Sequence, residues 1–555
     1  MKIALAQQNY HIGNFENNVL KIKQAIAKAK AQGADLIVFS ELAICGYPPK
    51  DFLQFNDFIS KCKSSIEEIA RESTGIATII GSPKINPQKE GKALFNSAYF
   101  LQDGKIKATC NKALLPTYDV FDESRYFETG SEFNIIEYKG KRIALTICED
   151  LWDEYTTQQM QGEEKVIKMY TVSPMDELAK QRPDVMINIA ASPFSYAHAE
   201  ERKKILIRNV KKYKIPLLYV NQVGAQTDLI FDGGSMVLNG DGKVHDELHY
   251  FEEDFRIYDL DNLTSATAAP IHTPVPAIHR MYDALVLGIS DYFQKSGFKK
   301  AILGVSGGID SAVVLALATK ALGKENVRAI LMPSHYSSDH SVNDAIALAK
   351  NLDVQYDIIT IKDIYNAFET TLQPHFEGLP FNIAEENLQA RTRGVLLMGL
   401  SNKFGYVLLN TSNKSELAVG YGTLYGDMCG GLSVLGDVYK TQIFELAKYI
   451  NTEQEIIPIN TIIKPPSAEL RPDQKDSDSL PEYDILDTIL FQYIENFKGP
   501  REIIAMGFEK ALVDRILKLV NTNEYKRHQC PPILRVSGKA FGSGRRMPIV
   551  GKYLS

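Results

Sequence analysis

The chain has 555 residues, which is too long for a single hydrophobic core, so two or more domains are expected. Hydrophobic residues make up 45% of the sequence and the formal net charge is -6, so the composition is that of a globular protein without the basic surface of a nucleic-acid-binding protein. The N-terminus lacks the apolar segment of a secretory signal, and no apolar run approaches the roughly 18 residues of a membrane span, which favours a cytoplasmic protein without membrane attachment.

The first half of the chain alternates short apolar segments with helical patterns. The helical patterns occupy residues 15–32 and 198–213. The apolar segments, rich in Val, Ile and Leu and bounded by turn residues, predict strands; they are MKIALAQ, ADLIVFSE, ATIIGSP, SAYFLQ, RIALTIC, DVMINIA and PLLYVNQ. This alternation predicts an α/β domain over residues 1–262, with helices covering the faces of its sheets.

Three polar side chains stand at the ends of predicted strands in this half. Glu41 ends ADLIVFSE, Lys112 follows IKATCN, and Cys148 ends RIALTIC. Side chains at strand ends of open α/β sheets can share one crevice, where a thiolate could attack an amide carbon. Glu41 could take the thiol proton and later activate water, while Lys112 could lower the thiol pKa and stabilise the oxyanion. Taken singly, Cys148 is as easily a buried apolar side chain and Lys112 a solvated one.

The remaining cysteines give no sign of a metal site. The six cysteines form no CxxC pair, which argues against a zinc site or a disulfide framework and favours a reducing cytoplasm.

The composition changes at residues 263–277, LTSATAAPIHTPVPA, whose small residues and three prolines predict an interdomain linker. Residues 281–297 then predict a helix, and later strand, loop and helix patterns predict a second α/β domain over residues 278–555. The polar segment at residues 470–484 is either a lid or a solvated loop.

The most specific local pattern is a glycine loop, Ser306-Gly307-Gly308-Ile309-Asp310-Ser311, placed between a predicted strand and a predicted helix. Its glycines would let main-chain N–H groups approach a phosphate chain, and the helix N-terminus adds partial positive charge. Asp310 is placed to hold a divalent cation on the phosphates. The loop lacks the GK[ST] ending of a Walker motif and resembles instead the pyrophosphate loop of the ATP-pyrophosphatase families.

The first half resembles the nitrilase superfamily in SELAICGYPPKD and in TICEDLW, which contain Glu41 and Cys148. This resemblance implies that Glu41, Lys112 and Cys148 are catalytic. It also implies a glutamine site at positions matching Tyr118, Ser192 and a basic residue, which is His198 in this sequence. Glu123, in VFDESRYF, is either a supporting acid or a surface residue.

The two halves together resemble the glutamine-dependent NAD synthetases. Asparagine synthetases use the residue after the initiator Met as nucleophile, here Lys2, and GMP synthetases carry a GxCxG elbow that is missing. The resemblance extends over essentially the full length; the second half contributes ENLQARTRG, NTSNKSELAVGYGTLYGDM, PPSAELRPDQKDSDSLPEYD, NEYKRHQCPP and AFGSGRRMPI. It implies a nitrilase-like α-β-β-α sandwich followed by a doubly wound parallel-sheet ATP-pyrophosphatase domain.

The resemblance also implies a reaction and its binding residues. ATP and glutamine would be co-substrates and Mg²⁺ the cofactor in the amidation of deamido-NAD to NAD. The residues implied for ATP are Gly304, Val305, Ser306, Gly307, Gly308, Ile309, Asp310, Ser311 and Thr411; those for deamido-NAD are Asn387, Glu416, Tyr421, Leu424 and Lys526; those for the metal are Asp310 and Glu416.

Two other functions fit parts of this pattern. A tRNA-modifying adenylase with an attached amidase would need a basic surface, which the acidic balance disfavours. A non-catalytic nucleotide sensor is opposed by the complete Glu41, Lys112 and Cys148 set. The resemblance further implies a homodimer or a larger homo-oligomer. We also expect ammonia to pass between the two sites without equilibrating with solvent, because protonated ammonia has no lone pair for attack.

Overall fold

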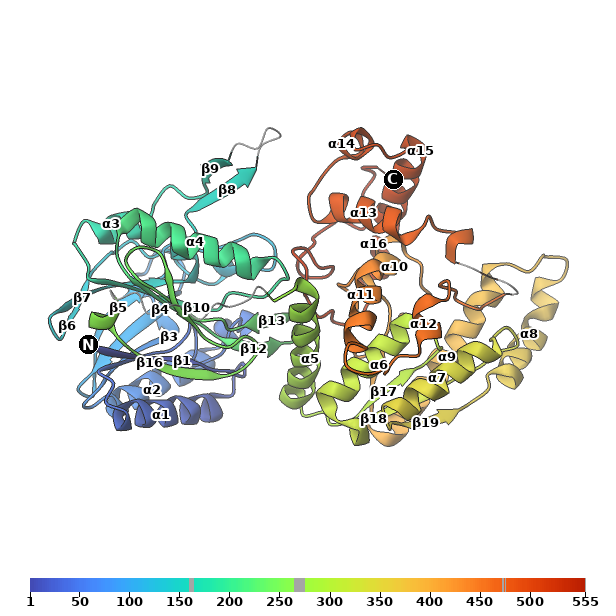
Figure 1. Cartoon of the computed structure of the whole chain (residues 1–555), viewed down its shortest axis with the longest axis horizontal. Helices are drawn as coiled ribbons and strands as arrows, with labels where there is room; N and C mark the ends of the chain where they lie inside the picture. The colour runs from blue at the N-terminus through green and yellow to red at the C-terminus, as the bar shows by residue number, and fades with distance from the viewer. Residues whose placement is uncertain (159–163, 264–274, 472–473, 475, 555) are drawn as a thin grey trace. The chain divides into compact units, whose positions relative to one another are not determined.

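The computed structural model describes residues 1–158, 164–263, 275–471, 474 and 476–554, and describes only the backbone of residues 155–158 and 164–167. The chain divides into two compact units, Met1–Pro274 and Val275–Ser555 (Figure 1). This division falls within the linker expected at residues 263–277, most of which lies outside the described residues. At its two ends, Leu263 is buried in the core of the first unit and Ala277 begins the first helix of the second.

Two six-stranded sheets form the centre of the first unit in the described residues. The first sheet has the order β16 (Asp254–Asp259), β1 (Lys2–Gln7), β2 (Leu36–Val38), β3 (Ala77–Ile85), β4 (Leu94–Gln102), β5 (Lys105–Asn111). The second has the order β15 (Val244–Glu247), β14 (Met236–Leu238), β11 (Leu217–Asn221), β10 (Val185–Ala190), β7 (Lys141–Ile147), β6 (Ile136–Tyr138). Two short hairpins accompany them, β8 (Glu154–Gln158) with β9 (Glu164–Lys168) and β12 (Val223–Gln226) with β13 (Leu229–Asp232).

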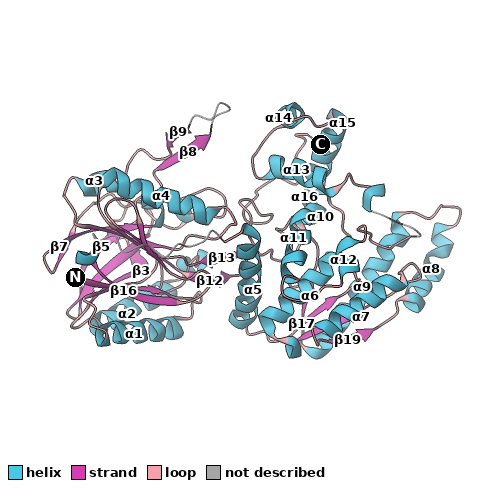
Figure 2. Ribbon diagram, viewed as in Figure 1, coloured by secondary structure: helices cyan, strands magenta, loops and turns pink. Residues whose placement is uncertain are grey.

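Alternating side chains of the strands explain the layers of this unit. In β1, Ile3 and Leu5 belong to the core between the two sheets, whereas Ala4 and Ala6 face the helices on the other side of the first sheet. The helices α1 (Phe15–Ala31) and α2 (Asn56–Glu72) cover the first sheet, and α3 (Pro174–Ala179) and α4 (His198–Tyr213) cover the second (Figure 2). The expected α-β-β-α sandwich is confirmed.

A parallel five-stranded sheet forms the centre of the second unit in its described part. Its order is β19 (Gln355–Ile358), β18 (Val327–Leu331), β17 (Ala301–Gly304), β20 (Val407–Asn410), β21 (Leu432–Ser433). The first strand of this unit, β17, therefore lies in the middle, and the winding direction reverses between β17 and β20, which is where such doubly wound sheets bind ligands. The expected doubly wound fold is confirmed.

Helices cover this sheet and extend beyond it. They are α5 (Ala277–Ser296), α6 (Ile309–Leu322), α7 (Asp339–Asn351), α8 (Lys362–Phe376), α9 (Ile383–Phe404), α10 (Lys414–Val419), α11 (Lys440–Ile450), α12 (Ile459–Ile463), α13 (Tyr483–Ile494), α14 (Pro500–Ala505), α15 (Lys510–Thr522) and α16 (Glu524–Arg527). A separate apolar cluster packs α10 against α13 and α15. No helix in the described ranges is long and apolar enough to cross a membrane.

The core between the two sheets should dominate the stability of the first unit. Leu145 in β7 is 1% exposed in this core, so Leu145→Ala should lower the free energy of unfolding by about 2–5 kcal/mol. Trp152 is the chain's only tryptophan, so its fluorescence during denaturant unfolding reports on this unit. Leu20→Ala, at a 51% exposed position in α1, is the matched control and should change the value by no more than about 0.5 kcal/mol. Equal effects of the two substitutions would contradict this assignment of the core.

Candidate active sites

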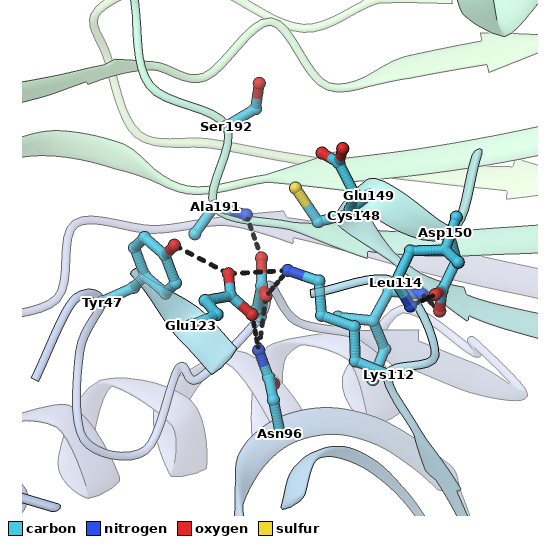
Figure 3. A network of polar contacts seen from close by, with 12 residues as sticks. Tyr47, Asn96, Lys112, Leu114, Glu123, Cys148, Glu149, Asp150, Ala191 and Ser192 are labelled. Atoms are coloured by element: carbon cyan, nitrogen blue, oxygen red, sulfur yellow. Dashed lines mark hydrogen bonds and ion pairs between the residues drawn. The ribbon is translucent and has the colours of Figure 1, made fainter. Parts of the chain in front are cut away.

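The three predicted catalytic residues lie together in the first unit. Glu41 follows β2 and Lys112 follows β5, both strands of the first sheet, whereas Cys148 directly follows β7 of the second sheet. The Nζ atom of Lys112 lies 2.8 Å from Oε1 of Glu41. Figure 3 shows Cys148 above Lys112, and the thiol is close enough for the charges of both residues to shift its pKa. The ends of two facing sheets therefore form one polar site.

Lys112 is fully buried and paired with two carboxylates. Its ammonium group donates to Glu41 and, at 2.7 Å, to Glu123. Asn96 Nδ2 donates to Glu41 at 2.7 Å and to Glu123 at 3.3 Å, and the Tyr47 hydroxyl donates to Glu123 at 2.8 Å (Figure 3). Burial lowers the pKa of Lys112, but the two carboxylates outweigh it and raise the pKa well above the ordinary value. Glu123 is thus part of the site, and its interpretation as a surface residue is wrong.

Cys148 occupies a strained turn and has a raised thiol pKa. Burial raises its pKa well above the ordinary value, Glu41 raises it further, and Lys112 only partly opposes them. Lys112 does lower the thiol pKa, as expected, but its effect is smaller than that of burial and the carboxylates, so the net pKa is raised. The backbone of Cys148 has a φ of 43°, in the left-handed region that non-glycine residues rarely adopt. Such strain at a polar site is typical of functional residues.

A second carboxylate lies beside the thiol. Glu149 is buried and accepts hydrogen bonds from the hydroxyls of Tyr118, at 3.0 Å, and Tyr170, at 2.8 Å. Burial raises the pKa of Glu149 to about 7, although the charge of Lys112 and the two tyrosine hydroxyls lower it. Glu149 was missed as a site residue; its position next to Cys148 was the available signal.

The other two residues expected to bind glutamine are neighbours. Ser192 follows β10, and its Oγ lies 3.0 Å from Nε2 of His198 at the start of α4. The His198 ring stacks on Trp152 with 5.0 Å between ring centroids. The structure thus places Tyr118 with Glu149 and Ser192 with His198, around the segment that begins at Cys148.

The second unit contains a cavity of about 310 Å³ at the carboxyl ends of β17, β18 and β20. The predicted residues among its described lining are Gly304, Val305, Ser306, Gly308, Ile309, Asp310, Ser311, Thr411, Glu416 and Tyr421. Gly307 completes the loop with a φ of 83°, and a Cβ atom there would lie 2.1 Å from the carbonyl oxygen of Ser341. Both the backbone conformation and the close approach therefore require glycine.

Charged side chains gather at one side of this cavity. Asp310 accepts hydrogen bonds from Lys440, at 2.6 Å, and from Asn413, at 2.9 Å, while Lys440 lies 3.8 Å from Glu416. Burial, followed by the charge of Asp310, raises the pKa of Glu416 to about 8. Asp476 also lines the cavity and raises the pKa of Glu416 further. Lys440 and Asp476 were not predicted: Lys440 lies outside the segments that carry the family resemblance, and Asp476 lies within one of them but was not singled out.

Comparison with known proteins gives the family of each part of the chain. Residues 2–269 match the carbon-nitrogen hydrolase family, and residues 281–530 match the NAD synthase family. A glutamine-dependent NAD(+) synthetase of Synechocystis sp. is 48% identical, over 99% of this chain and 98% of that protein. The chain belongs to the glutamine-dependent NAD(+) synthetases. The corresponding protein of Acinetobacter baylyi is 44% identical over the same shares of the two chains.

A solved structure extends the likeness to three dimensions. The glutamine-dependent NAD+ synthetase from Acinetobacter baumannii in complex with ADP has a TM-score of 0.76 and 40% identity, covering 99% of this chain and 98% of that one. The family resemblance expected from the sequence is thereby confirmed, and the tRNA-modifying adenylase and the sensor lose their support.

Three residues that the resemblance to the NAD synthetases assigns to deamido-NAD are not in the described lining of this cavity. Leu424 belongs to the loop at residues 420–426, and Asn387 and Lys526 contact that loop. Asn387 accepts a hydrogen bond from the Thr423 hydroxyl at 2.7 Å, the carbonyl group of Leu424 accepts one from Arg391, and Lys526 donates to the carbonyl oxygen of Gly420 at 2.7 Å. In this structure the hydrogen bonds of these residues therefore stabilise the conformation of that loop.

Proposed function

We propose that this protein makes NAD by ATP-dependent amidation of deamido-NAD, with ammonia released from glutamine in the first unit. The observation that supports this most is that one chain holds both a buried Cys–Lys–Glu site and a glycine-loop cavity. The carbon-nitrogen hydrolase and NAD synthase families, matched at residues 2–269 and 281–530, support a separate role for each site.

Glutamine hydrolysis would begin with the neutral Cys148 thiol. As Sγ attacks the amide carbon, Glu41 takes the thiol proton, and Lys112 stabilises the negative charge that develops on the amide oxygen. Glu41 then delivers the proton to the leaving nitrogen, and ammonia departs from a thioester. Water, deprotonated by Glu41, hydrolyses the thioester to glutamate and restores the thiol. Because the resting thiol has a raised pKa, the thiolate forms only as the bond to carbon forms.

Substrate recognition would use the charges around Cys148. The carboxylate of Glu149 complements the α-ammonium group of glutamine, and Tyr118 orients that carboxylate. Ser192 and His198, whose Oγ and Nε2 atoms lie 3.0 Å apart, complement the α-carboxylate. Ligands with both groups, and not simple amides, would therefore bind well.

Amidation would take place at the cavity of the second unit. The carboxylate oxygen of deamido-NAD attacks the α-phosphorus of ATP and expels pyrophosphate; ammonia then attacks the acyl adenylate and expels AMP. Ser306 and the N-terminus of α6 would hold the phosphates. Mg²⁺ would offset phosphate charge when bound. Asp310 and Glu416 would hold it, since their oxygens are the ligands that Mg²⁺ prefers. In the described residues no larger set of acidic, His or Cys side chains could hold a metal.

The homo-oligomeric state, the cytoplasmic location and the protected passage of ammonia stay predictions.

Cys148→Ala tests the separation of the two half-reactions. Glutamine-dependent NAD formation from deamido-NAD and ATP should be lost, because no other residue supplies the nucleophile, while ammonia-dependent formation should continue. Cys62→Ala, which removes another buried thiol of the first unit, is the control. NAD is measured with each nitrogen source. A folded Cys148→Ala protein that loses both activities would refute the separation.

Asp310→Asn tests the carboxylate that faces the phosphates. Synthesis with glutamine and with ammonia should fall together, by about 100-fold or more, because both routes require adenylation. Asp353→Asn, at an exposed carboxylate of the same unit, should retain activity. The measurement is pyrophosphate release over a range of Mg²⁺ concentrations. Near-normal release by Asp310→Asn at low Mg²⁺ would rule out the proposed role.

The charge of Glu149 should appear in the pH dependence of glutamine use. Since burial raises the pKa of Glu149 to about 7, the carboxylate gains a proton and loses its charge as the pH falls through that value. The kcat/KM for glutamine hydrolysis should therefore decrease from about pH 8 to about pH 6. Glu149→Gln should have a low kcat/KM at the upper pH and lose this decrease. A Glu149→Gln profile that keeps the wild-type slope would contradict the assignment.

A further inference from the structure

Asp150 lies two residues after Cys148 and has no part in the steps above. It belongs to a 3₁₀ helix, η3 (Cys148–Leu151), and is 2% exposed. Its carboxylate accepts three main-chain hydrogen bonds: Oδ1 from the N–H groups of Ala113 and Leu114, both at 2.9 Å, and Oδ2 from Ile147 at 3.0 Å (Figure 3). Both oxygens of this carboxylate are therefore in use.

The three donors flank two of the catalytic residues. Ala113 and Leu114 directly follow Lys112, and Ile147 directly precedes Cys148. The first segment leaves β5 of the first sheet, and the second leaves β7 of the second sheet. One carboxylate thus connects the main chains that carry the ammonium group and the thiol, across the interface of the two sheets.

The conformation of Cys148 adds a reason for this connection. The left-handed φ of 43° at Cys148 persists only if its surroundings hold it, and the hydrogen bond from Ile147 to Asp150 closes the turn around that residue. An amide in place of the carboxylate would have a single acceptor oxygen. Its NH₂ group would face either the N–H of Ile147 or those of Ala113 and Leu114, so one side of the connection would be lost.

The second unit contains a similar buried aspartate, but its main-chain partners do not adjoin a proposed nucleophile. Asp437 is fully buried and accepts hydrogen bonds from the main-chain N–H groups of Val536, at 2.8 Å, and Ser537, at 2.7 Å. A buried aspartate with several N–H partners can therefore serve the fold alone. Asp150 differs in what it connects, because its partners adjoin the two groups whose separation sets the reactivity of the thiol.

We propose that Asp150 is a positioning residue of glutamine hydrolysis, which fixes the Cys148 thiol relative to the Lys112 ammonium group by holding the main chain on both sides. This inference rests on the proposed glutaminase activity of the first unit. A displacement of about 1 Å between reacting groups can reduce a rate on the order of 100-fold, so loss of this connection should reduce kcat even if the unit stays folded.

Asp150→Asn is the direct test. Its kcat for glutamine hydrolysis should fall by about 10- to 100-fold with little change in KM, while ammonia-dependent NAD synthesis stays at the wild-type level. The alkylation of Cys148 by iodoacetamide should shift to higher pH, because a displaced Lys112 stabilises the thiolate less. Asp246→Asn is the matched control: this carboxylate of the same unit accepts hydrogen bonds from Arg256 and Tyr258, and its loss should leave kcat and the alkylation profile unchanged.

The possible outcomes distinguish a positioning role of Asp150 from an effect on stability and from a failure of the proposed function. Trp152 fluorescence gives the folded fraction of each variant. A folded Asp150→Asn protein with wild-type kcat and alkylation profile would overturn the proposal, as would a loss equal to its unfolded fraction. If Asp150→Asn does not fold, Asp150→Glu decides: it keeps the charge but moves the oxygens by one methylene group, and wild-type values would overturn the proposal. Absence of glutamine hydrolysis in the wild-type protein would refute the proposed function instead.

Discussion

Burying the ammonium group of Lys112 between Glu41 and Glu123 constrains everything around the cysteine. A lone charge at such a site would be strongly destabilising, and a pair is tolerated only when its remaining hydrogen-bonding capacity is also satisfied. Further hydrogen bonds satisfy the two carboxylates here. Glu41 accepts one from Asn96 and one, at 2.9 Å, from the N–H group of Ala191, and Glu123 accepts one from Tyr47. Two carboxylates share one cation, and burial, with the charge of Glu41, raises the pKa of Glu123 despite the opposing effect of Lys112. A thiolate at Cys148 would be buried and would add a further negative charge, so burial, and then the charge of Glu41, raise the pKa of the thiol.

The cavity of the second unit also contains more acidic than basic groups, but it is arranged differently. Lys440 contacts Asp310 and Glu416, and Asp476 lies near, so the carboxylates outnumber the cation in this cluster. Phosphates would be repelled by such a cluster unless another cation joined it. In the first site the charged groups are paired by hydrogen bonds within the protein, and the substrate is a neutral amide. In the second site the carboxylates are in excess over the cation, beside a loop that presents N–H groups to anions. This imbalance is what the proposed Mg²⁺ would correct.

The sequence predicted two α/β domains because local patterns indicate them: apolar strands, glycine turns and amphipathic helices are visible within short windows. The two-sheet sandwich of the first unit was implied only by the family resemblance. The sequence also predicted Glu41, Lys112 and Cys148, because each ends a strand and strand ends converge. It left Glu123 undecided, since a polar loop residue becomes buried only when two sheets close over it. Lys440 begins α11, far in sequence from the glycine loop, and nothing local relates it to Asp310. The sequence also could not predict whether the pKa of Cys148 is raised or lowered, because the shift depends on the balance between burial and two opposite charges.

Both sites contain a turn with left-handed backbone after a strand, but a different type of residue occupies the turn in each. In each, a strand ends in a turn with left-handed backbone, at Cys148 with a φ of 43° and at Gly307 with a φ of 83°. The glycine loop works through main-chain N–H groups, so the turn can be made by a residue without a side chain, at no steric cost. The nucleophile must carry its sulfur at the turn itself, so glycine cannot serve and strain of about 1–3 kcal/mol has to be held by neighbours. The difference explains why the cysteine turn is enclosed by buried hydrogen bonds while the phosphate loop is mainly self-bonded: Gly308 N–H donates to Ser306 at 3.2 Å, and Ser311 donates to the Gly308 carbonyl at 3.0 Å.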